Sequence, residues 1–453
     1  MTKTTIKNTS HLTLHTSHLK KILFWANGFS HCTYLNPNDF GDTYPQKPFK
    51  KLLAIGAKKI VNFTKIAENN QQNNSFQQLQ KHHENNQNWL FGYFSYDLKN
   101  ELEKLESNNF DALNFADIYF YEPEYLLIFD ENSNKNTDFE LITTHNISKE
   151  GLLEEIEKYY QDCCQKPLSK PSNINIQARI TQEKYLQTIQ KLKEHIFKGD
   201  IYEVNFCMEF FAENVALNSL EAYFLLNELS PMPFSAYHKI NDNYVICASP
   251  ERFLKKIGNK IISQPIKGTA KRGNTPQEDE IIKQNLLNNP KERSENIMIV
   301  DLVRNDLARS AKTGTVCVDE LLGLYTFKQL HQLISTVSAQ VAGNEVNNNN
   351  FAKIIQNAFP MGSMTGAPKI KAMQIIENEE VIKRSLYSGA LGYIMPNGDF
   401  DFNVMIRSIL YNAQNQYLSF QVGSAITAEA NPQQEYEECL LKSQAIRNVL
   451  AKL

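Results

Sequence analysis

Short runs of apolar residues with the length of β-strands recur along this chain. Residues 118–121 (IYFY) and 125–129 (YLLIF) are rich in aromatic and β-branched side chains, as strands are. Residues 201–206 (IYEVNF) and 243–248 (NYVICA) repeat this pattern further along. We therefore expect strands in the first third of the chain and again in the part that follows.

Apolar residues at helical spacing appear between the later strands. Thr181 can cap a helix, and Gly199 can end it. The apolar side of this helix is formed by Tyr185, Ile189, Leu192 and Ile196. A second helix is expected to begin near Pro368, since proline is favoured in the first helical turn. Its apolar side is formed by Ile370, Met373 and Ile376.

A break in these patterns at residues 166–175 divides the chain. This segment contains two prolines and two serines and reads as a linker. It separates a β-rich N-terminal domain, residues 1–165, from a larger domain, residues 176–453. Runs of Asn and Gln at residues 69–74 and 347–350 predict solvated loops. With 453 residues the chain is too long for one ordinary core and suits two large lobes.

Composition and charge exclude several classes of protein. Hydrophobic residues make up 42% and charged residues 21%, as in a soluble globular protein. The net charge of −3 provides no basic field for nucleic acid and no polybasic patch for a membrane. Residues 1–25 lack the apolar stretch of a signal peptide, and no later run is long enough to span a bilayer. Seven scattered cysteines suit reduced thiols, so we expect a cytoplasmic protein.

Lys267 is the residue with the most distinctive surroundings. It lies between Pro265, which has a fixed φ, and Gly268, which permits close backbone approach. The preceding pair Ile261-Ile262 is apolar. A lysine held in such surroundings would lose solvation, have a lowered pKa and become a nucleophile. The alternative is a lysine at a strand end with its ammonium in water.

A predicted hairpin brings a carboxyl group toward this amine. Gly258-Asn259 fits a two-residue turn between two strand-like arms. Extending that register places Glu251 opposite Ile266. A strict ladder would put Glu251 and Lys267 on opposite faces, but a bulge near Pro265 would turn the amine toward the carboxyl group.

Three further segments carry candidate binding groups. Residues 359–369 form a glycine-containing loop that leads into a helix, whose free N–H groups would favour an anion; an ordinary junction is the alternative. Arg407 ends a largely apolar strand, residues 402–407, and its fork fits a carboxylate, either of a ligand or of a structural ion pair. Tyr387 would supply a hydroxyl donor if it is not simply part of the core.

Acidic residues near the C-terminus share one helical face. Glu435, Glu438 and Lys442 are spaced at i, i+3 and i+7. The alternative is that Glu438 and Lys442 form an ordinary ion pair on the surface of the helix. Glu295 precedes the apolar residues 297–300. Because Mg²⁺ is typically held by one or two carboxylates with ligand oxygens and waters, Glu295 and Glu438 are candidate ligands.

These motifs, in this order, resemble the chorismate-utilising enzyme family, and most closely its aminodeoxychorismate branch. The segments that carry the resemblance are residues 199–205, 249–253, 265–269, 291–296, 300–306, 362–369, 387–393, 406–407 and 432–442. The match covers about residues 180–453, and residues 91–98 extend it toward the N-terminus. It implies an α+β fold with two lobes, in which β-sheets are sandwiched between helical layers. It also implies Mg²⁺ and chorismate, a small diacid with a C4 hydroxyl.

The resemblance further implies roles for individual residues. Glu295 and Glu438 would bind Mg²⁺, and Glu435 would support that site. Glu251 would be the general acid that protonates the leaving C4 hydroxyl. The groups expected to hold the substrate carboxylates are Thr365, Tyr387, Arg407, Gly423 and Lys442.

Lys267 and Glu203 separate the branches of this family. The aminodeoxychorismate branch often carries lysine at the position of Lys267, where anthranilate synthases carry alanine. The resemblance implies that this amine adds at C2 as the C4 hydroxyl leaves, and that ammonia then adds at C4 and expels the lysine. Isochorismate and salicylate synthases carry a lysine base at the position of Glu203. The carboxylate found there argues against water addition, although glutamine is more common in the aminodeoxychorismate branch.

The resemblance implies a separate glutamine amidotransferase subunit as the source of ammonia. Two departures are Asn296 and Gln332, each at a position where histidine is common, and His331 is expected to point elsewhere. The alternatives are anthranilate synthase component I, an isochorismate or salicylate synthase, and a catalytically silent homologue that senses a small diacid.

Overall fold

The computed structural model describes residues 17–40, 44–63, 74–103, 105–130, 136–163, 174–343 and 350–453. Most of the predicted linker and most of the two Asn- and Gln-rich runs lie outside these ranges. Within them, no helix is long and apolar enough to cross a membrane. No disulfide joins the cysteines that the structure describes.

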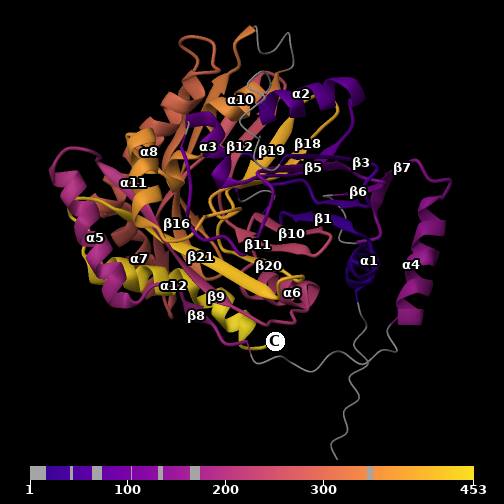
Figure 1. The fold of residues 1–453 in the computed structure, drawn as a ribbon. Coiled ribbons are helices and arrows are strands. Elements are labelled where there is room, and N and C mark those ends of the chain that lie inside the picture. Colours follow the sequence, from indigo (N-terminus) through magenta and orange to yellow (C-terminus); the bar gives the residue numbers. More distant parts are fainter. Residues whose placement is uncertain are drawn as a thin grey trace, which may run out of the picture.

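Two large antiparallel sheets form the framework (Figure 1). The first has 11 strands, and its path runs through β17 (Gly366–Ala367), β9 (Glu203–Ala212), β21 (Tyr417–Ile426), β20 (Ser408–Asn412), β11 (Asn243–Ser249), β10 (Phe234–Ile240), β1 (His31–Asn36), β2 (Leu52–Ile55), β6 (Tyr125–Phe129) and β7 (Phe139–Thr143). The short strand β8 (Gln177–Ala178) pairs with β9.

The second sheet has 10 strands. Its path runs through β14 (Ile266–Lys271), β16 (Leu330–Gln340), β13 (Lys260–Gln264), β12 (Arg252–Ile257), β19 (Phe400–Asn403), β18 (Ala390–Ile394), β4 (Leu90–Phe94), β5 (Ile118–Glu122) and β3 (Lys59–Phe63). The strand β15 (Cys317–Thr326) pairs with β16.

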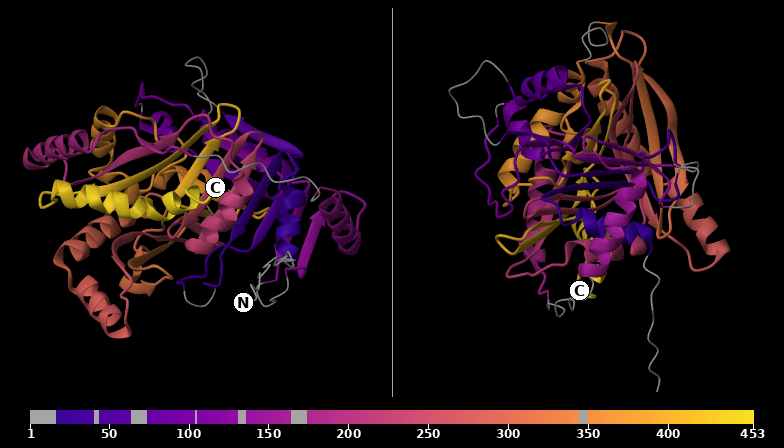
Figure 2. Two further views of the ribbon diagram at one scale, coloured as in Figure 1. Left: turned by 90° about the horizontal axis from the view of Figure 1, so that it is seen from below. Right: turned by 90° about the vertical axis from the view of Figure 1, so that its right-hand side faces the viewer.

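Helices cover the outer faces of the sheets (Figure 2). Those packed on the first sheet include α5 (Gln182–Phe197), α6 (Ser219–Leu229), α11 (Lys369–Glu379) and α12 (Pro432–Leu450), and those on the second include α7 (Pro276–Asn288) and α8 (Pro290–Ala308). The remaining helices are α1 (His18–Ala26), α2 (Ser75–Asn86), α3 (Lys99–Glu103), α4 (Lys149–Cys163) and α10 (Phe351–Ala358), with the 3₁₀ turns η1 (Tyr96–Leu98) and η2 (Gly362–Met364). The expected fold, with sheets between helical layers, is confirmed.

The two sheets pack face to face through a shared apolar core that contains a few paired polar groups. Thr33 of β1 lies 2.7 Å from the hydroxyl of Tyr121 in β5, and His31 lies 2.8 Å from that of Tyr119. Most of this core consists of buried apolar side chains from both sheets, and their burial holds the sheets together.

Strands from both sides of residues 166–175 pair with one another. β1 pairs with the later strand β10, and β4 pairs with the later strand β18. The N-terminal strands β1 to β7 thus complete both sheets. The division into domains at that segment stays a prediction, and the sheets themselves run across it.

Most of the elements expected from apolar spacing are present. The side chain of Thr181 accepts a hydrogen bond from the backbone N–H of Lys184 and caps α5, as its position predicted. β5, β6 and β11 occupy the predicted runs, whereas β9 begins only at Glu203. The β12–β13 turn has the predicted register as far as Lys255 opposite Ile262.

The hairpin prediction fails beyond that point. A register shift between Arg252 and Lys255 places Arg252 opposite Gln264, so the expected pairing of Glu251 with Ile266 is wrong. The residues after Gln264 do not continue the pairing with β12. They form β14, which pairs with β16 instead. The extra residue in β12 is a bulge, which changes every later pairing along that arm.

Candidate active site

One cavity collects nearly all the residues singled out from the sequence. It lies between β9, β14 and β21 and the helices α8 and α12, and it encloses about 900 Å³ when the solvent space at its mouth is included. The predicted residues in its wall are Glu251, Lys267, Glu295, Tyr387, Arg407, Gly423, Glu435, Glu438 and Lys442. A cavity of this size can hold a small organic ligand.

Thr365 is the predicted residue that does not reach this wall. It is completely buried, its N–H donates to Gly362 O, and its carbonyl accepts from Asn205 N. Its neighbours Ser363 and Met364 line the cavity instead. Its expected contact with a substrate carboxylate therefore stays a prediction, and its observed bonds hold the loop to β9.

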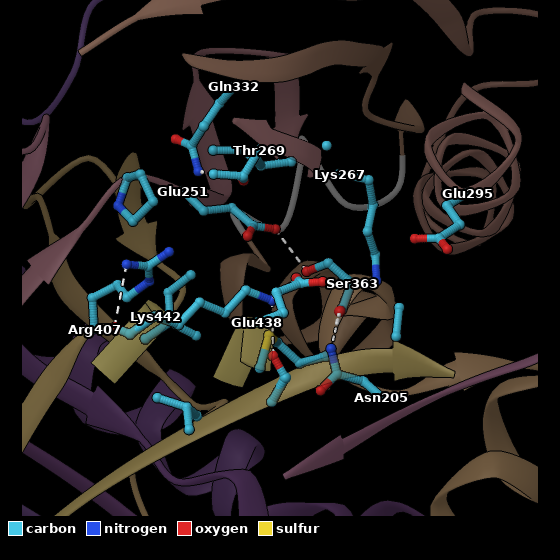
Figure 3. A pocket seen from close by; sticks show the side chains of 18 of the residues that line it. Asn205, Glu251, Lys267, Thr269, Glu295, Gln332, Ser363, Arg407, Glu438 and Lys442 are labelled. Atoms are coloured by element: carbon cyan, nitrogen blue, oxygen red, sulfur yellow. Dashed lines mark hydrogen bonds and ion pairs between the residues drawn. The ribbon is translucent and has the colours of Figure 1, made fainter. Parts of the chain in front are cut away.

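Glu251 has the surroundings of a carboxylic acid. It is 4% exposed, and its Oε1 accepts a hydrogen bond of 2.6 Å from Ser363 Oγ (Figure 3). Burial raises its pKa to about 7, although Ser363 and the charge of Lys267 act in the opposite direction. A carboxyl group that is still partly protonated near neutral pH can act as a general acid.

Lys267 is paired with an acid that sequence reasoning left without a role. Its Nζ lies 2.9 Å from Oε1 of Glu203, and its side chain is only 10% exposed. Burial alone would lower the pKa of this lysine, but Glu203, Glu295 and Glu251 outweigh burial and raise it. The expected lowering of the pKa is therefore wrong for this structure, in which the neighbouring acids favour the ammonium form of Lys267.

The backbone around Lys267 is held in place by its neighbours. Gly268 has φ of +96°, and an added Cβ would meet Leu333 Cδ1 at 3.0 Å, so the position needs glycine. Asn296 Nδ2 donates to Lys267 O at 3.2 Å, and Asn296 Oδ1 accepts from Ser335 Oγ at 2.6 Å. Asn296, where histidine was expected, thus anchors the strand that carries the amine.

Gln332 and His331 lie on β16, the strand that pairs with β14. Gln332 lines the cavity, and its Nε2 donates weakly to Thr269 Oγ1 at 3.4 Å. His331 points away, as predicted: its ring nitrogens lie 2.9 Å from Asp279 Oδ1 and 2.9 Å from Thr326 Oγ1.

Cationic groups gather at one side of the cavity. Arg407 lies between β19 and β20, with φ of +53°, so the expectation that it belongs to a strand is wrong. Its guanidinium makes one long hydrogen bond, 3.4 Å to Lys442 O, and forms no ion pair with any carboxylate of the described residues. Lys442 Nζ donates to Gly423 O at 2.8 Å and contacts Glu438 at 2.6 Å. A partly buried guanidinium with no acidic partner suits a ligand carboxylate.

Tyr387 lies in a buried turn before β18. Its hydroxyl is 3.8 Å from Cys207 Sγ, which donates to it. It is 4% exposed, and its ring packs in the core while the residue also borders the cavity. Both readings of Tyr387 from the sequence, core residue and cavity residue, therefore apply.

Acidic groups of the cavity wall come from the helices α8 and α12. Glu435 and Glu438 come from α12, and Glu295 comes from α8, with Glu292 one turn before it. Lys291 lies among them, with its Nζ 2.8 Å from Glu435 and 3.8 Å from Glu295. Burial raises the pKa of Glu295 to about 7. Burial also opposes ionisation of Glu438, but the neighbouring lysines, Lys442 first, outweigh it and lower the pKa of this group.

Comparison with known proteins identifies the family to which this chain belongs. The model of a family described as chorismate binding enzyme matches residues 30–448. This chain is a member of the chorismate-binding enzyme family. The resemblance drawn from the ordered motifs is confirmed.

The relatives include more than one branch of the chorismate-binding family. An anthranilate synthase component I-like protein from Synechocystis sp. is 34% identical over 371 residues, which cover 81% of this chain and 73% of that protein. Aminodeoxychorismate synthase component 1 from Bacillus subtilis is 31% identical over 372 residues, which cover 80% of this chain and 77% of that protein. Overall identity therefore does not choose between the two aminations.

A solved structure shares the fold. The crystal structure of anthranilate synthase component I from Streptococcus pneumoniae TIGR4 matches with a TM-score of 0.72 and 24% identity, covering 89% of this chain and 93% of that one. At that identity the likeness speaks for the fold alone.

The acidic side of the cavity offers the groups for the expected metal ion. Among the residues that the structure describes, no cluster of three His, Cys, Asp or Glu side chains is arranged to hold a metal. Mg²⁺ needs fewer protein ligands, since one or two carboxylates with ligand oxygens and waters suffice. Glu295 fits because its buried Oε1 accepts no hydrogen bond within the described part of the chain. Glu438 is the second candidate, although Lys442 now holds its carboxylate.

Sequence reasoning missed several groups in the wall of the cavity. Ser363, Lys291 and Glu292 lie inside motifs that were recognised, but their side chains were given no role. Asn205 and Gln421 also line the cavity, from β9 and β21. Alternation along β9 from Glu203 was the one signal that would have placed Asn205 on the same side of the strand.

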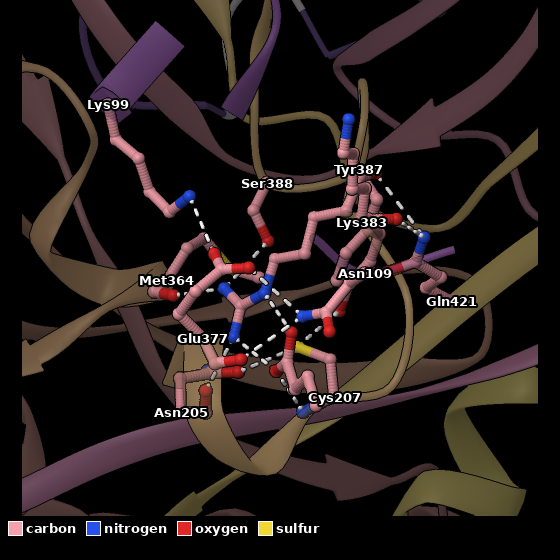
Figure 4. Close-up of polar contacts among 12 residues, drawn as sticks. Lys99, Asn109, Asn205, Cys207, Met364, Glu377, Lys383, Tyr387, Ser388 and Gln421 are labelled. Atoms are coloured by element: carbon pink, nitrogen blue, oxygen red, sulfur yellow. Dashed lines mark hydrogen bonds and ion pairs between the residues drawn. The ribbon is translucent and has the colours of Figure 1, made fainter. Parts of the chain in front are cut away.

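A buried arginine outside the predicted set ties the wall together. Arg384 is 1% exposed and donates to the carbonyls of Met364 at 2.6 Å and Asn205 at 2.7 Å. Glu380 pairs with Arg384 at 2.6 Å and accepts from Cys207 N at 2.9 Å. Figure 4 shows Met364, Asn205 and Cys207 drawn together by these contacts. Strand β9, the turn η2 and the segment after α11 are thereby joined at one point.

Proposed function

We propose that this chain is aminodeoxychorismate synthase component I, which converts chorismate and ammonia to 4-amino-4-deoxychorismate for para-aminobenzoate and folate synthesis. The observation that carries the proposal is the position of Lys267, an amine in the same cavity as the acid Glu251. Family membership supports chorismate as the substrate.

The charges of the cavity suit a small diacid. Arg407 has no acidic partner among the described residues, and Lys442 lies beside it. One substrate carboxylate would bind at this cationic side, where a bidentate guanidinium contact is available. The other carboxylate would lie toward the acids of α8 and α12, which requires a cation between them.

We propose Mg²⁺ as that cation, held by Glu295 and Glu438 with support from Glu435. When bound, the ion would neutralise the repulsion between these carboxylates and the carboxylate of the substrate. The assignment is supported by Oε1 of Glu295, which is buried and accepts no hydrogen bond among the described residues.

The protein groups suit replacement of the C4 hydroxyl. Glu251 would give its proton to the leaving hydroxyl, consistent with a pKa raised to about 7 by burial. Lys267, as the free amine, would form a bond to C2 while the C4–O bond breaks. Ammonia would then add at C4, and the bond from Lys267 to C2 would break.

Ammonia would come from a partner. We propose a separate glutamine amidotransferase subunit, in keeping with the name component 1 carried by the Bacillus subtilis relative. Ammonium salts would replace that subunit in a test with the chain alone.

Anthranilate synthase component I is the second candidate. The relative from Synechocystis sp. bears that kind of name at 34% identity, and Lys267 is engaged in an ion pair with Glu203. Addition of ammonia at C2 without a covalent step would explain such a lysine.

The product and the covalent intermediate decide between the two candidates. Chorismate, Mg²⁺ and an ammonium salt should yield the 4-amino product, and intact-protein mass spectrometry without ammonia should find an adduct on Lys267. Lys267→Ala should remove the adduct and slow the 4-amino product. A 2-amino product from the native chain, or a wild-type rate in Lys267→Ala, would refute the proposal.

A further inference from the structure

We propose that Glu203 is the proton acceptor of Lys267: its carboxylate takes a proton from the ammonium before the amine attacks and returns it when the lysine is expelled. This inference rests on the proposed covalent role of Lys267. It assigns a function to a residue that the motifs left unexplained.

The two groups are held in direct contact. Glu203 is 1% exposed, and its Oε1 lies 2.9 Å from Lys267 Nζ. Among the described carboxylates, Glu203 is the one in ion-pair contact with this amine. Pairing of Ala367 in β17 with Glu203 fixes the backbone at the start of β9. The acceptor is thus placed by the sheet and not by a mobile loop.

The second carboxylate oxygen of Glu203, Oε2, is available to accept a hydrogen bond or a proton. Oε2 is buried and has no hydrogen-bond partner in the part of the chain that the structure describes. Most buried side-chain oxygens are satisfied, so an orphaned carboxylate oxygen is a costly feature for a merely structural ion pair. Protonation of the carboxylate lowers that cost, because a neutral acid is easier to bury than an ion.

Transfer within the pair also avoids the creation of a buried charge. The pair is neutral in sum both as ammonium with carboxylate and as amine with carboxylic acid. A substrate that excludes water would favour the second form, since desolvation penalises both ions. Loss of the proton to bulk water would instead leave an uncompensated carboxylate beside the amine.

Other charged groups face Lys267 from the surrounding elements. They are Glu251 before β12, Glu292 and Glu295 on α8, and Glu438 on α12. All are acids and favour the ammonium form of the lysine. Near neutral pH, Lys267 therefore becomes a free amine only if a group in contact with it accepts the proton of the ammonium.

The cycle balances in atoms and charge. The proton of Lys267 moves to Glu203, the bond from nitrogen to C2 forms, and the C4 hydroxyl leaves as water with the proton of Glu251. Ammonia forms the bond to C4 and the bond from Lys267 to C2 breaks. The released amine regains its proton from Glu203, and Glu251 takes the extra proton from the new ammonium group at C4.

The test is the pH dependence of adduct formation in Glu203→Gln. Glutamine keeps the size of the side chain but cannot accept the proton, which must then pass to water. The rate of adduct formation on Lys267, measured by mass spectrometry with chorismate and no ammonia, is divided by the native rate at each pH. This ratio should rise about tenfold per pH unit below the pKa of the amine, because the fraction of free amine rises by that factor. The contribution of Glu251 cancels in the ratio.

Two further variants make the result specific. Glu203→Asp keeps a carboxylate, so its ratio should stay constant with pH even if the rate is lower. Glu209→Gln removes another buried acid of β9, one that pairs with Arg179 at 2.8 Å outside the cavity, and should behave as the native chain.

The outcomes separate this proposal from the proposed function. If the native chain forms the adduct and the ratio for Glu203→Gln is flat, Glu203 is not the acceptor while the covalent step stands. If Glu203→Gln does not fold, a rising ratio in Glu203→Asp refutes the relay. If the native chain forms no adduct, the covalent function fails, and the relay fails with it.

Discussion

Removal of the Ser363 hydroxyl should shift the pH profile of the enzyme. Ser363 Oγ donates to Glu251 Oε1 at 2.6 Å, and both residues are nearly fully buried. The bond favours the carboxylate form and so holds the pKa of Glu251 down against the effect of burial. Hydrogen bonds to charged groups contribute roughly 1.5–3 kcal/mol. At about 1.4 kcal/mol per pKa unit, Ser363→Ala should raise the pKa of Glu251 by roughly one to two units.

The sign of the effect on activity follows from the role of the acid. A general acid must be protonated, so kcat/KM for chorismate should fall as the pH rises through the pKa of Glu251, which is about 7. In Ser363→Ala this alkaline limb should move to higher pH by roughly one to two units. The assay follows chorismate consumption across the pH range with free ammonia held constant and saturating.

A matched control isolates the effect. Ser338 is also buried and donates to a carboxylate, Asp319 at 3.0 Å, but on β15 and β16 and outside the set of cavity residues. Ser338→Ala should leave the profile unchanged. An alkaline limb in Ser363→Ala that stays in place or moves to lower pH would refute the assignment of Glu251 as the acid whose pKa this hydroxyl lowers.

Three other changes test the remaining parts of the site. Glu438→Ala should abolish Mg²⁺-dependent turnover, and near-native activity at limiting Mg²⁺ would exclude Glu438 as a ligand. The purified chain should use ammonium at high pH but use glutamine only with an added amidotransferase subunit; glutamine-dependent activity of the chain alone would contradict this. Arg407→Lys keeps the charge but loses the bidentate fork, so kcat/KM should fall by an amount equivalent to about 1–3 kcal/mol, and an unchanged value would remove Arg407 from the substrate site.

Local patterns were enough to predict many of the elements. Thr181 and the apolar residues that follow it specify α5, because capping and helical periodicity depend on residues within a few turns. The two-residue turn at Gly258-Asn259 likewise set the first pairs of the β12–β13 hairpin. The spacing of Glu435 and Glu438 placed both on one face of α12.

The ordered motifs also identified most of the cavity wall in advance. Family resemblance named Glu251, Lys267 and Arg407, and the structure brings all three to one cavity. For Thr365 the expected substrate contact stays a prediction, because its backbone groups are already bonded within the protein. A motif specifies which residues belong together but not which of them face the space between the elements.

Only the tertiary structure decided the contacts between segments that lie far apart in the chain. Lys267 and Glu203 come from different sheets, and Ser363 reaches Glu251 from a loop more than a hundred residues away. The bulge in β12 removed the pairing that a regular hairpin would give, since one extra residue shifts the register of all that follow. The sequence by itself therefore determined the elements, the family and the chemical groups available. The protonation of those groups was decided by burial and by neighbouring charges, which exist only after the two sheets have come together.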